Sequence, residues 1–319
     1  MIEVFHKLQS NDYEHPFDKK ALELLKGTPG LEPVCKAIIT YGYERIISTQ
    51  YMGSCLKVNS SVCPEIFNLL TQCCKTLNIQ NIPDLYIQLE YGINAFTIGL
   101  DKPIIVINSG AVDLLTEKEQ IFLIGHELGH IKSQHMLYHM LAELMETGGL
   151  WISQATLGLG SLISFPLQSA LYYWSRMSEF TADRAGLLAC QDISSVASIM
   201  MKMSGLPTRF YGQLSPEAFI EQAKAFQALD YETLNLTWRV LMQLNQTHPW
   251  TVMRTEELIR WMNTEQYKHF LSENYWEQEK RFFQKERKFV CQNCGCELVV
   301  LNQKCRQCGS ELNSVILDR

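Results

Sequence analysis

The pattern of apolar and polar positions predicts helices in both halves of the chain and a short sheet between them. Apolar residues recur at helical spacing over 21–25 and 34–47, and Pro64 can open a helix that runs to Leu77. Three later segments are short, rich in β-branched and aromatic residues, and bounded by Pro, Gly, Asn or Asp, which is typical of strands. These segments are 85–90, 94–100 and 103–108. Because helices dominate again afterwards, to about residue 288, the order predicts an α+β fold and not alternating βαβ units.

The most distinct helical pattern covers residues 116–145. Thr116 and Glu119 form a Thr-x-x-Glu capping box in front of an apolar run, and no proline interrupts the segment. Apolar residues then recur at roughly helical spacing, so we expect one helix that is buried on much of its surface. They are Ile121, Ile124, Leu128, Ile131 and Leu137.

The same segment contains His126-Glu127-Leu128-Gly129-His130, an HExxH motif. Residues four apart lie nearly above one another on a helix, so both imidazoles can reach one metal ion. Glu127 is then placed to take a proton from a metal-bound water, whose pKa zinc can lower from about 15.7 to roughly 7. The alternative is a pair of core histidines held by hydrogen bonds, which explains each histidine only singly. The motif therefore predicts zinc-peptidase chemistry with Glu127 as the general base.

A catalytic zinc ion typically has three protein ligands and one open position, so one ligand remains to be found. The metzincin continuation HExxHxxGxxH is absent, because Ser133 and Met136 occupy its glycine and histidine positions. Downstream, Glu179 and Asp183 are four residues apart on a second predicted helix. Glu179 would complete a His/His/Glu site, and Asp183 would hydrogen-bond the outer nitrogen of a ligand histidine. A solvated acidic face is the alternative.

With these motifs the chain resembles the HtpX-like zinc metallopeptidases, a gluzincin group that also contains the type I CAAX prenyl proteases. The resemblance covers about residues 48–254 and includes STQYMGS at 48–54, Asn94-Ala-Phe, HELGHIKSQH and SEFTADRAGLL. It implies a mainly helical zincin-type metallopeptidase domain with a small sheet. It also implies a site in which the ligands are His126, His130 and Glu179, with Glu127 as base and Asp183 as support.

The resemblance gives roles to two further segments. Asn94, Ala95 and Phe96 would lie on an edge strand beside the metal, where an extended substrate adds as another strand; an ordinary half-buried strand is the alternative. His248, followed by Pro249, would either stabilise the oxyanion of the reaction as a catalytic residue or mark a helix start. Arg254 is interpreted as structural.

Two more histidines, His135 and His139, are also four residues apart, but Met136 stands where the base would be. We expect both to be partly exposed on the helix.

A second metal signature lies near the C-terminus, where Cys291-x2-Cys294 and Cys305-x2-Cys308 are separated by ten residues. Four thiolates in two such pairs can close a tetrahedral structural zinc site, a zinc ribbon that would depend on the metal to fold. Cys296 could replace Cys294, although the repeated Cys-x-x-Cys-Gly pattern favours Cys294. A redox dithiol or a disulfide pair is the alternative. A ribbon of this kind can bind a protein partner, and the family resemblance does not cover it.

Composition agrees with an enzyme in a reducing compartment. The chain has 319 residues, 11 cysteines and a net charge of −6. Five cysteines crowd the last thirty residues, so a disulfide scaffold is not expected. The N-terminal segment lacks the long apolar core of a signal peptide, and we predict a cytoplasmic protein. The charge gives no electrostatic case for nucleic-acid binding by the whole chain, and the basic run over 280–288 is interpreted as a solvated connector.

These landmarks divide the chain into four predicted parts. They are an N-terminal helical region over 1–80, a zinc metallopeptidase core over 81–265, a charged helical connector over 266–289 and a zinc ribbon over 290–312.

One stretch, residues 147–175, contains no charged residue. It is long enough for a membrane span of about 20 residues, but glycines, serines, glutamines and Pro166 dilute its apolar character. Peripheral membrane contact or a hydrophobic substrate-facing surface over 148–174 is a second interpretation, and packing between the two ligand helices is the one we favour.

The sequence thus predicts a zinc-dependent metalloendopeptidase that hydrolyses proteins or peptides and holds two Zn²⁺ ions, one catalytic and one structural in the ribbon. The main alternative is a zinc-ribbon adaptor protein with a latent or inactive peptidase site. A di-iron bundle needs two Glu-x-x-His pairs, and besides Glu127 to His130 the chain offers only Glu3 to His6.

Overall fold

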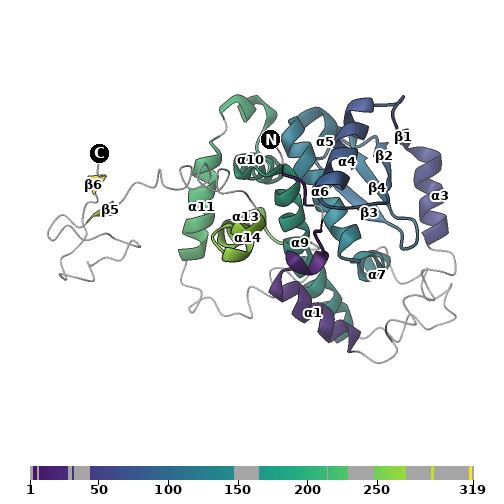
Figure 1. Cartoon of the computed structure of the whole chain (residues 1–319), viewed down its shortest axis with the longest axis horizontal. Helices are drawn as coiled ribbons and strands as arrows, with labels where there is room; N and C mark the ends of the chain where they lie inside the picture. Colours follow the sequence, from purple (N-terminus) through teal and green to yellow (C-terminus); the bar gives the residue numbers. More distant parts are fainter. Residues whose placement is uncertain are drawn as a thin grey trace. The chain divides into compact units, whose positions relative to one another are not determined.

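The chain forms two compact units, unit 1 over Met1–Tyr267 and unit 2 over Lys268–Arg319. The computed structural model describes residues 3–5, 7–27, 31, 44–146, 165–213, 215–228, 248–270, 289–290 and 316–317. Within unit 1, Figure 1 shows a sheet with helices around it and the long helices α6 and α9 beside each other in the middle.

The sheet of unit 1 has four strands in the order β1-β2-β4-β3. The strands β2 (Asp84–Gln88), β3 (Ala95–Ile98) and β4 (Ile104–Asn108) confirm the three predicted strands, with slightly different ends. The fourth strand, β1 (Leu56–Val58), lies in the region predicted to be mostly helical. The sequence did not predict it, because three residues are too few to show a periodicity of two. β2 and β4 are parallel, whereas β3 runs antiparallel to β4 and is one of the two edge strands in the described part of the sheet.

Three helices precede or interrupt the sheet. The predicted helix that opens at Pro64 is confirmed as α4 (Pro64–Thr76). Near the N-terminus, α1 (Pro16–Lys26) covers the predicted helical segment 21–25. Of the predicted segment 34–47, only 44–47 are described, and they lie in α3 (Glu44–Ser54).

The central helix α6 (Glu117–Lys132) begins as predicted with a capping box, in which the Thr116 N–H donates to Glu119 Oε2 at 2.7 Å. The prediction of one helix over 116–145 is wrong, because α6 ends at Lys132 and α7 (Met136–Glu146) follows it. Gln134 adopts a left-handed backbone with φ of 57°, and its N–H donates to Ile131 O while the His135 N–H donates to His130 O. These two bonds form a Schellman motif, which usually carries glycine at the left-handed position. The sequence lacks that glycine and so gives no sign of the break.

The helix α9 (Phe165–Cys190) contains the second predicted helix and packs closely on α6. Small residues allow the close approach: a Cβ atom placed on Gly129 would lie 2.6 Å from Ala185 Cβ, and one on Gly125 would lie 2.5 Å from Ala189 Cβ.

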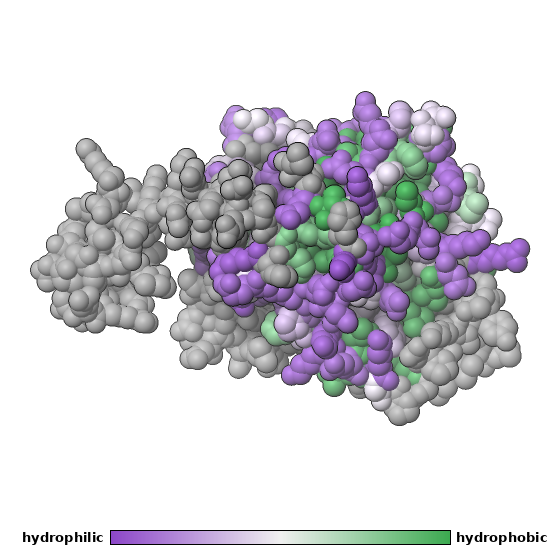
Figure 2. Space-filling view, viewed as in Figure 1, coloured by the Kyte–Doolittle hydropathy of each residue, from purple (hydrophilic) through white to green (hydrophobic). Residues whose placement is uncertain are grey.

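The main apolar core joins α1, the sheet, α7 and α9, with Leu25, Ile98, Leu141 and Trp174 among its buried side chains. Figure 2 shows that the surface around α1 is mostly hydrophilic, while hydrophobic residues reach the surface on the side of the sheet.

The remaining described elements of unit 1 are helical. They are η1 (Ser10–Asp12), α5 (Ser109–Leu114), α10 (Ile193–Met203), η4 (Thr208–Gln213), α11 (Pro216–Ala228), α13 (Thr251–Met262) and α14 (Glu265–Phe270), the last of which crosses into unit 2.

Among the helices described, none is both long and apolar enough to cross a membrane. Of the uncharged stretch 147–175, residues 165–175 belong to α9 and 147–164 lie outside the described residues.

In unit 2, the short strands β5 (Phe289–Val290) and β6 (Ile316–Leu317) form an antiparallel pair. The cysteines of the predicted zinc ribbon, including Cys296, fall between these strands and outside the described residues.

Candidate active site

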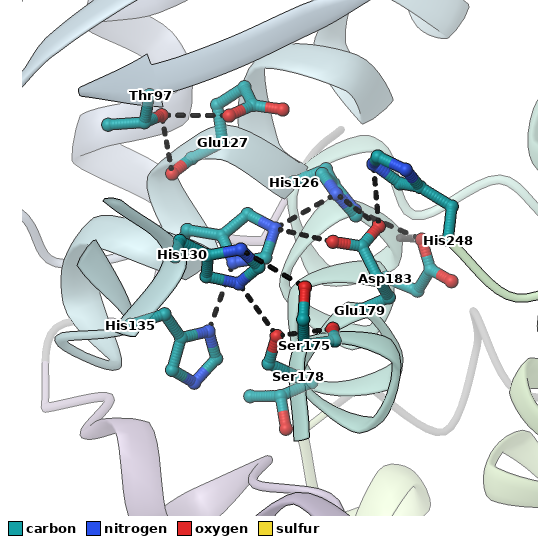
Figure 3. Close-up of polar contacts among 12 residues, drawn as sticks. Thr97, His126, Glu127, His130, His135, Ser175, Ser178, Glu179, Asp183 and His248 are labelled. Carbon is teal, nitrogen blue, oxygen red and sulfur yellow. Dashed lines mark hydrogen bonds and ion pairs between the residues drawn. The ribbon is translucent and has the colours of Figure 1, made fainter. Parts of the chain in front are cut away.

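Two helices bring together the side chains that the sequence singled out as metal ligands. His126 and His130 lie one turn apart on α6, and Glu179 faces them from α9 (Figure 3). The Nε2 atoms of the two histidines are 3.2 Å apart. Glu179 places Oε2 at 3.4 Å from His126 Nε2 and Oε1 at 3.3 Å from His130 Nε2. All three side chains are buried.

The arrangement fits a metal ion with nitrogen and oxygen ligands. Ligand atoms about 2.0–2.1 Å from a tetrahedral zinc ion lie about 3.3–3.4 Å from one another, close to the separations found here. Among the described residues, none donates a hydrogen bond to the buried Glu179 Oε2. Burial raises the pKa of Glu179, but His248, His126 and His130 outweigh it and hold that pKa well below its usual value. A buried, ionised carboxylate oxygen without a hydrogen-bond donor is a chemically suitable ligand for a cation.

Asp183 and Arg254 support His126 from behind. His126 Nδ1 lies 3.0 Å from Asp183 Oδ1, and Arg254 donates to both oxygens of Asp183, from Nε at 2.8 Å and from Nη2 at 2.6 Å. Burial by itself would lower the pKa of His126, but Asp183 and Glu179 outweigh burial and raise this pKa to about 9. The contact with Asp183 orients the ring of His126 so that Nε2 points toward Glu179. Arg254, on α13, touches the site through Asp183 and lies 3.7 Å from Glu179 Oε2.

Glu127 is held beside the histidines by the edge strand. Its carboxylate oxygen Oε2 accepts a hydrogen bond of 2.8 Å from Thr97 Oγ1, on β3 (Figure 3). The side chain is buried, and burial raises the pKa of Glu127 above its ordinary value. A raised pKa strengthens this carboxylate as a proton acceptor.

A cavity of about 240 Å³ opens onto these side chains. Its walls come from the start of β3 and the residue before it, from α6, from the end of α10 and from the segment at the start of α13. They include Asn94, Ala95, Phe122, Leu123, His126, Glu127, Met203, His248, Pro249, Thr251 and Arg254. The His248 side chain is 56% exposed, and its Nε2 lies 3.6 Å from Glu179 Oε2, so it stands at the mouth of the cavity and not in the core.

Comparison with known proteins agrees with this geometry, because the model of peptidase family M48 matches residues 64–262. The chain belongs to peptidase family M48. It is a metallopeptidase, and its substrates are proteins or peptides. Its α+β fold, mainly helical with a small sheet, is the fold predicted from the sequence.

Among relatives of this M48 peptidase, the plastoglobule-localized metallopeptidase 48 of Arabidopsis thaliana is 32% identical over 84% of the chain and 77% of its own length. A protease HtpX homolog 2 of Methanosarcina acetivorans is 28% identical over 48% of the chain and 59% of its own length. A protease HtpX homolog of Moorella thermoacetica is 28% identical over 49% and 58%. The chain thus spans less than two thirds of these two HtpX homologues. No solved structure matches the chain.

Sequence reasoning about the M48 site missed several polar contacts. It expected His135 and His139 to be partly exposed, which is wrong for His135: the side chain is 1% exposed and folds back under His130, because the chain turns at Gln134. His139 is half-buried against Ser175 and Ser178. Thr97 was not singled out, although a hydroxyl one residue beyond the Asn94-Ala95-Phe96 segment was a signal that could have found it.

Proposed function

We propose that this peptidase is a zinc-dependent endopeptidase in which His126, His130 and Glu179 hold the catalytic metal. The proposal rests on the convergence of two Nε2 atoms and a buried carboxylate to within 3.2–3.4 Å, with Glu179 Oε2 left without a donor in the described part of the chain. A bound zinc ion supplies Lewis acidity, which polarises a carbonyl and lowers the pKa of water from about 15.7 to roughly 7.

Glu127 serves as the general base in this proposal. Thr97 occupies its Oε2 atom, so Oε1 is the oxygen that takes the proton from the attacking water and returns it to the leaving amine. The hydrogen bond fixes the carboxylate beside the histidines, and the cavity gives a substrate access to it.

The substrate binds along β3 as an added strand, with Asn94, Ala95 and Phe96 as the proposed contact segment. The Asn108 N–H donates to Asn94 O, and hydrogen-bonded pairs alternate along an antiparallel ladder. The main-chain groups of Ala95 and Thr97 therefore point away from β4, toward the outer side of this edge strand. Asn94 and Ala95 also line the cavity, so a peptide on this edge would pass directly over Glu127.

His248 is the proposed oxyanion donor. It lines the same cavity as Asn94 and Ala95, and its exposed ring is accessible to a substrate oxygen. Asp183 acts through His126 as its positioning residue.

The second zinc ion of the proposal is structural and is held by Cys291, Cys294, Cys305 and Cys308. The pairing of β5 with β6 supports it, because these strands bracket the cysteine segment and bring its two ends together. The chain would then comprise a helical region over 1–80, the peptidase core over 81–265, a connector over 266–289 and the ribbon over 290–312. The ribbon remains a candidate surface for a protein partner.

The deciding experiment measures zinc per chain and cleavage of casein or a peptide library for wild type, Glu127→Gln and Glu117→Gln. Glu117 is an exposed residue on the same helix and serves as the matched control. We expect about two zinc ions in all three proteins and loss of cleavage in Glu127→Gln alone. Activity in Glu127→Gln would overturn the assignment of the base. His126→Ala should lower the count to about one, and an unchanged count would overturn the ligand set.

A further inference from the structure

His130 uses both of its ring nitrogens. Nε2 faces His126 and Glu179, while Nδ1 lies 3.0 Å from Nδ1 of His135. His135 in turn places Nε2 at 3.0 Å from Asp18 Oδ2, a carboxylate of the N-terminal helix α1. His135 is 1% exposed and Asp18 is fully buried. Figure 3 shows His130 between the His126 side of the site and His135.

The hydrogens of this chain of contacts are fixed once His130 directs the lone pair of Nε2 at a metal. A neutral imidazole carries one hydrogen, so that hydrogen must then be on Nδ1. Nδ1–H of His130 donates to Nδ1 of His135, which leaves the hydrogen of His135 on Nε2, where it donates to Asp18. Each donated hydrogen then has one acceptor, and the hydrogen bonds run in one direction, from His130 through His135 to Asp18.

Hydrogen bonds hold the start of α1 against α9, the helix that carries Glu179, so Asp18 cannot easily move away. Thr181, which stands between Glu179 and Asp183 on α9, donates to Asp18 Oδ2 at 2.6 Å and accepts from the His15 N–H at 3.0 Å. Burial raises the pKa of Asp18, but its contacts with His135 and Thr181 outweigh it, so the pKa lies below its usual value.

A second metal site is the competing interpretation, because His130, His135 and His139 also place nitrogen atoms within 4.8 Å of one another. Their nitrogens already have hydrogen-bond partners, however. Ser178 donates its hydrogen to Ser175 O, so Ser178 Oγ accepts from His139 Nε2 at 2.8 Å. Nδ1 of His139 faces Ser175 Oγ at 3.4 Å. Glu179 Oε2 has no hydrogen-bond donor among the described residues, whereas every ring nitrogen of His130, His135 and His139 has a partner.

We propose that Asp18 and His135 form a positioning pair that fixes the ring and tautomer of His130 for metal binding. The inference rests on the ligand set of the proposed function. It gives each ligand histidine its own carboxylate: Asp183 contacts His126 directly, and Asp18 reaches His130 through His135.

Zinc affinity of the histidine site tests the pair. His135→Phe removes the acceptor for His130 Nδ1 and should weaken zinc binding there about 10–100-fold. His135→Asn can place a carbonyl oxygen near the position of Nδ1 and should restore most of the affinity. Asp18→Leu should also weaken binding, and the double variant should lose no more than His135→Phe, because Asp18 acts through His135.

Glu257→Gln is the matched control. Glu257 Oε2 lies 3.1 Å from His15 Nε2, so this change loosens the same N-terminal segment without touching Asp18 or His135, and zinc affinity should stay at the wild-type level. A loss equal to that of Asp18→Leu would show that docking of the segment, and not the hydrogen-bonded pair, supports the metal.

Nuclear magnetic resonance of ¹⁵N-labelled histidine rings during zinc titration against a chelator reports this site without interference from the cysteines. In the zinc-loaded wild type we expect hydrogens on Nδ1 of His130 and on Nε2 of His135. Thermal melts of the metal-free variants show whether each is folded, and Asp18→Leu carries the test if His135→Phe does not fold.

The outcomes separate the two proposals. If the wild-type histidines bind no zinc, the proposed function fails and the positioning pair fails with it. If wild type binds zinc and His135→Phe binds it as tightly, or if His135 carries its hydrogen on Nδ1, only the positioning pair is overturned.

Discussion

At the scale of single residues, Thr97 links the edge strand to the chemistry. Its hydroxyl donates to Glu127 Oε2 at 2.8 Å, and a hydrogen bond to a charged group contributes about 1.5–3 kcal/mol. Thr97→Val keeps the shape of the side chain, so we expect kcat to fall about 10–100-fold while zinc content is unchanged. Steady-state kinetics with a peptide substrate measures the effect. Thr97→Ser should keep most of the activity, and equal loss in both variants would contradict the role of the hydroxyl.

His248 allows a second test at this scale. If its ring donates to the oxyanion, His248→Ala should lower kcat by about 10²–10³-fold with little change in zinc content or thermal stability. The reason to expect a stable variant is its exposure of 56%, which leaves few packing contacts to lose. Activity within a few-fold of wild type would return His248 to a structural role. Metal analysis and a thermal melt of the same sample provide the controls.

The buried cysteines give a prediction that depends on pH. Burial raises the pKa of Cys74 and of Cys190 to about 12 and that of Cys73 well above its usual value. Because the thiolate is the reactive form, these thiols stay protonated through pH 8 and gain reactivity only as the pH approaches their raised pKa. Among the cysteines that the structure describes, we expect iodoacetamide at pH 8 to label the half-buried Cys55 and Cys63 before the three buried ones. Peptide mapping by mass spectrometry gives the order, and early labelling of Cys74 would contradict it.

Residue spacing predicted only those parts of the candidate site that lie within a single helix. HExxH and the Glu179 to Asp183 spacing are local patterns, so the sequence could nominate four side chains that the structure then brings together. The Thr97 contact spans 30 residues, and the Asp18–His135 contact joins α1 to the turn between α6 and α7. No spacing rule connects such pairs, because their proximity is created by packing between elements.

At the scale of elements, the distance between α6 and α9 is set by small residues. A Cβ atom on Gly129 would meet Ala185 Cβ at 2.6 Å and Ala182 Cα at 3.1 Å, which is too close for ordinary packing. Gly129→Ala should therefore force the helices apart and destabilise the fold by about 1–3 kcal/mol. Because Glu179 lies on the displaced helix, zinc binding at the histidines should weaken as well. Chemical denaturation and zinc titration measure the two effects.

Gly53→Ala is the matched control for this substitution. Gly53 lies in α3, and a Cβ atom there would have no neighbour within 4 Å. Its replacement should be neutral or stabilising by up to about 1 kcal/mol, since alanine restricts the unfolded chain. If both variants lose the same stability, the short interhelical distance at Gly129 would not explain the result.

The elements themselves were predictable where a periodicity is long enough to be read. The start of α6 followed from its capping box and the start of α4 from Pro64. The end of α6 did not, because Gln134 adopts the left-handed conformation in place of glycine. That turn has a consequence for the site, since it sends His135 back under His130 and does not let it continue along the helix surface.

At the scale of the whole molecule, unit 1 builds its site from both of its ends. Asp18 comes from α1 and Arg254 from α13, and these two residues reach opposite ligand histidines through His135 and Asp183. A contact of 3.1 Å between Nε2 of His15, the N-cap residue of α1, and Oε2 of Glu257 on α13 links the same two helices directly. Stability of unit 1 and order of the metal site are therefore coupled, which gives metal removal a measurable effect on unfolding.

Zinc that binds only the folded site adds RT ln(1 + [Zn²⁺]/Kd) to the free energy of unfolding, about 2.7 kcal/mol at free zinc 100 times Kd. We expect this gain for wild type and its loss in His126→Ala, because that variant lacks one ligand to the metal. A Cys291→Ser/Cys305→Ser variant should keep the gain for unit 1, since the proposed ribbon cysteines belong to unit 2. Denaturation in zinc buffers of defined free concentration, followed by tryptophan fluorescence, measures it. An equal gain in His126→Ala would mean that zinc stabilises unit 1 from somewhere other than the histidine site.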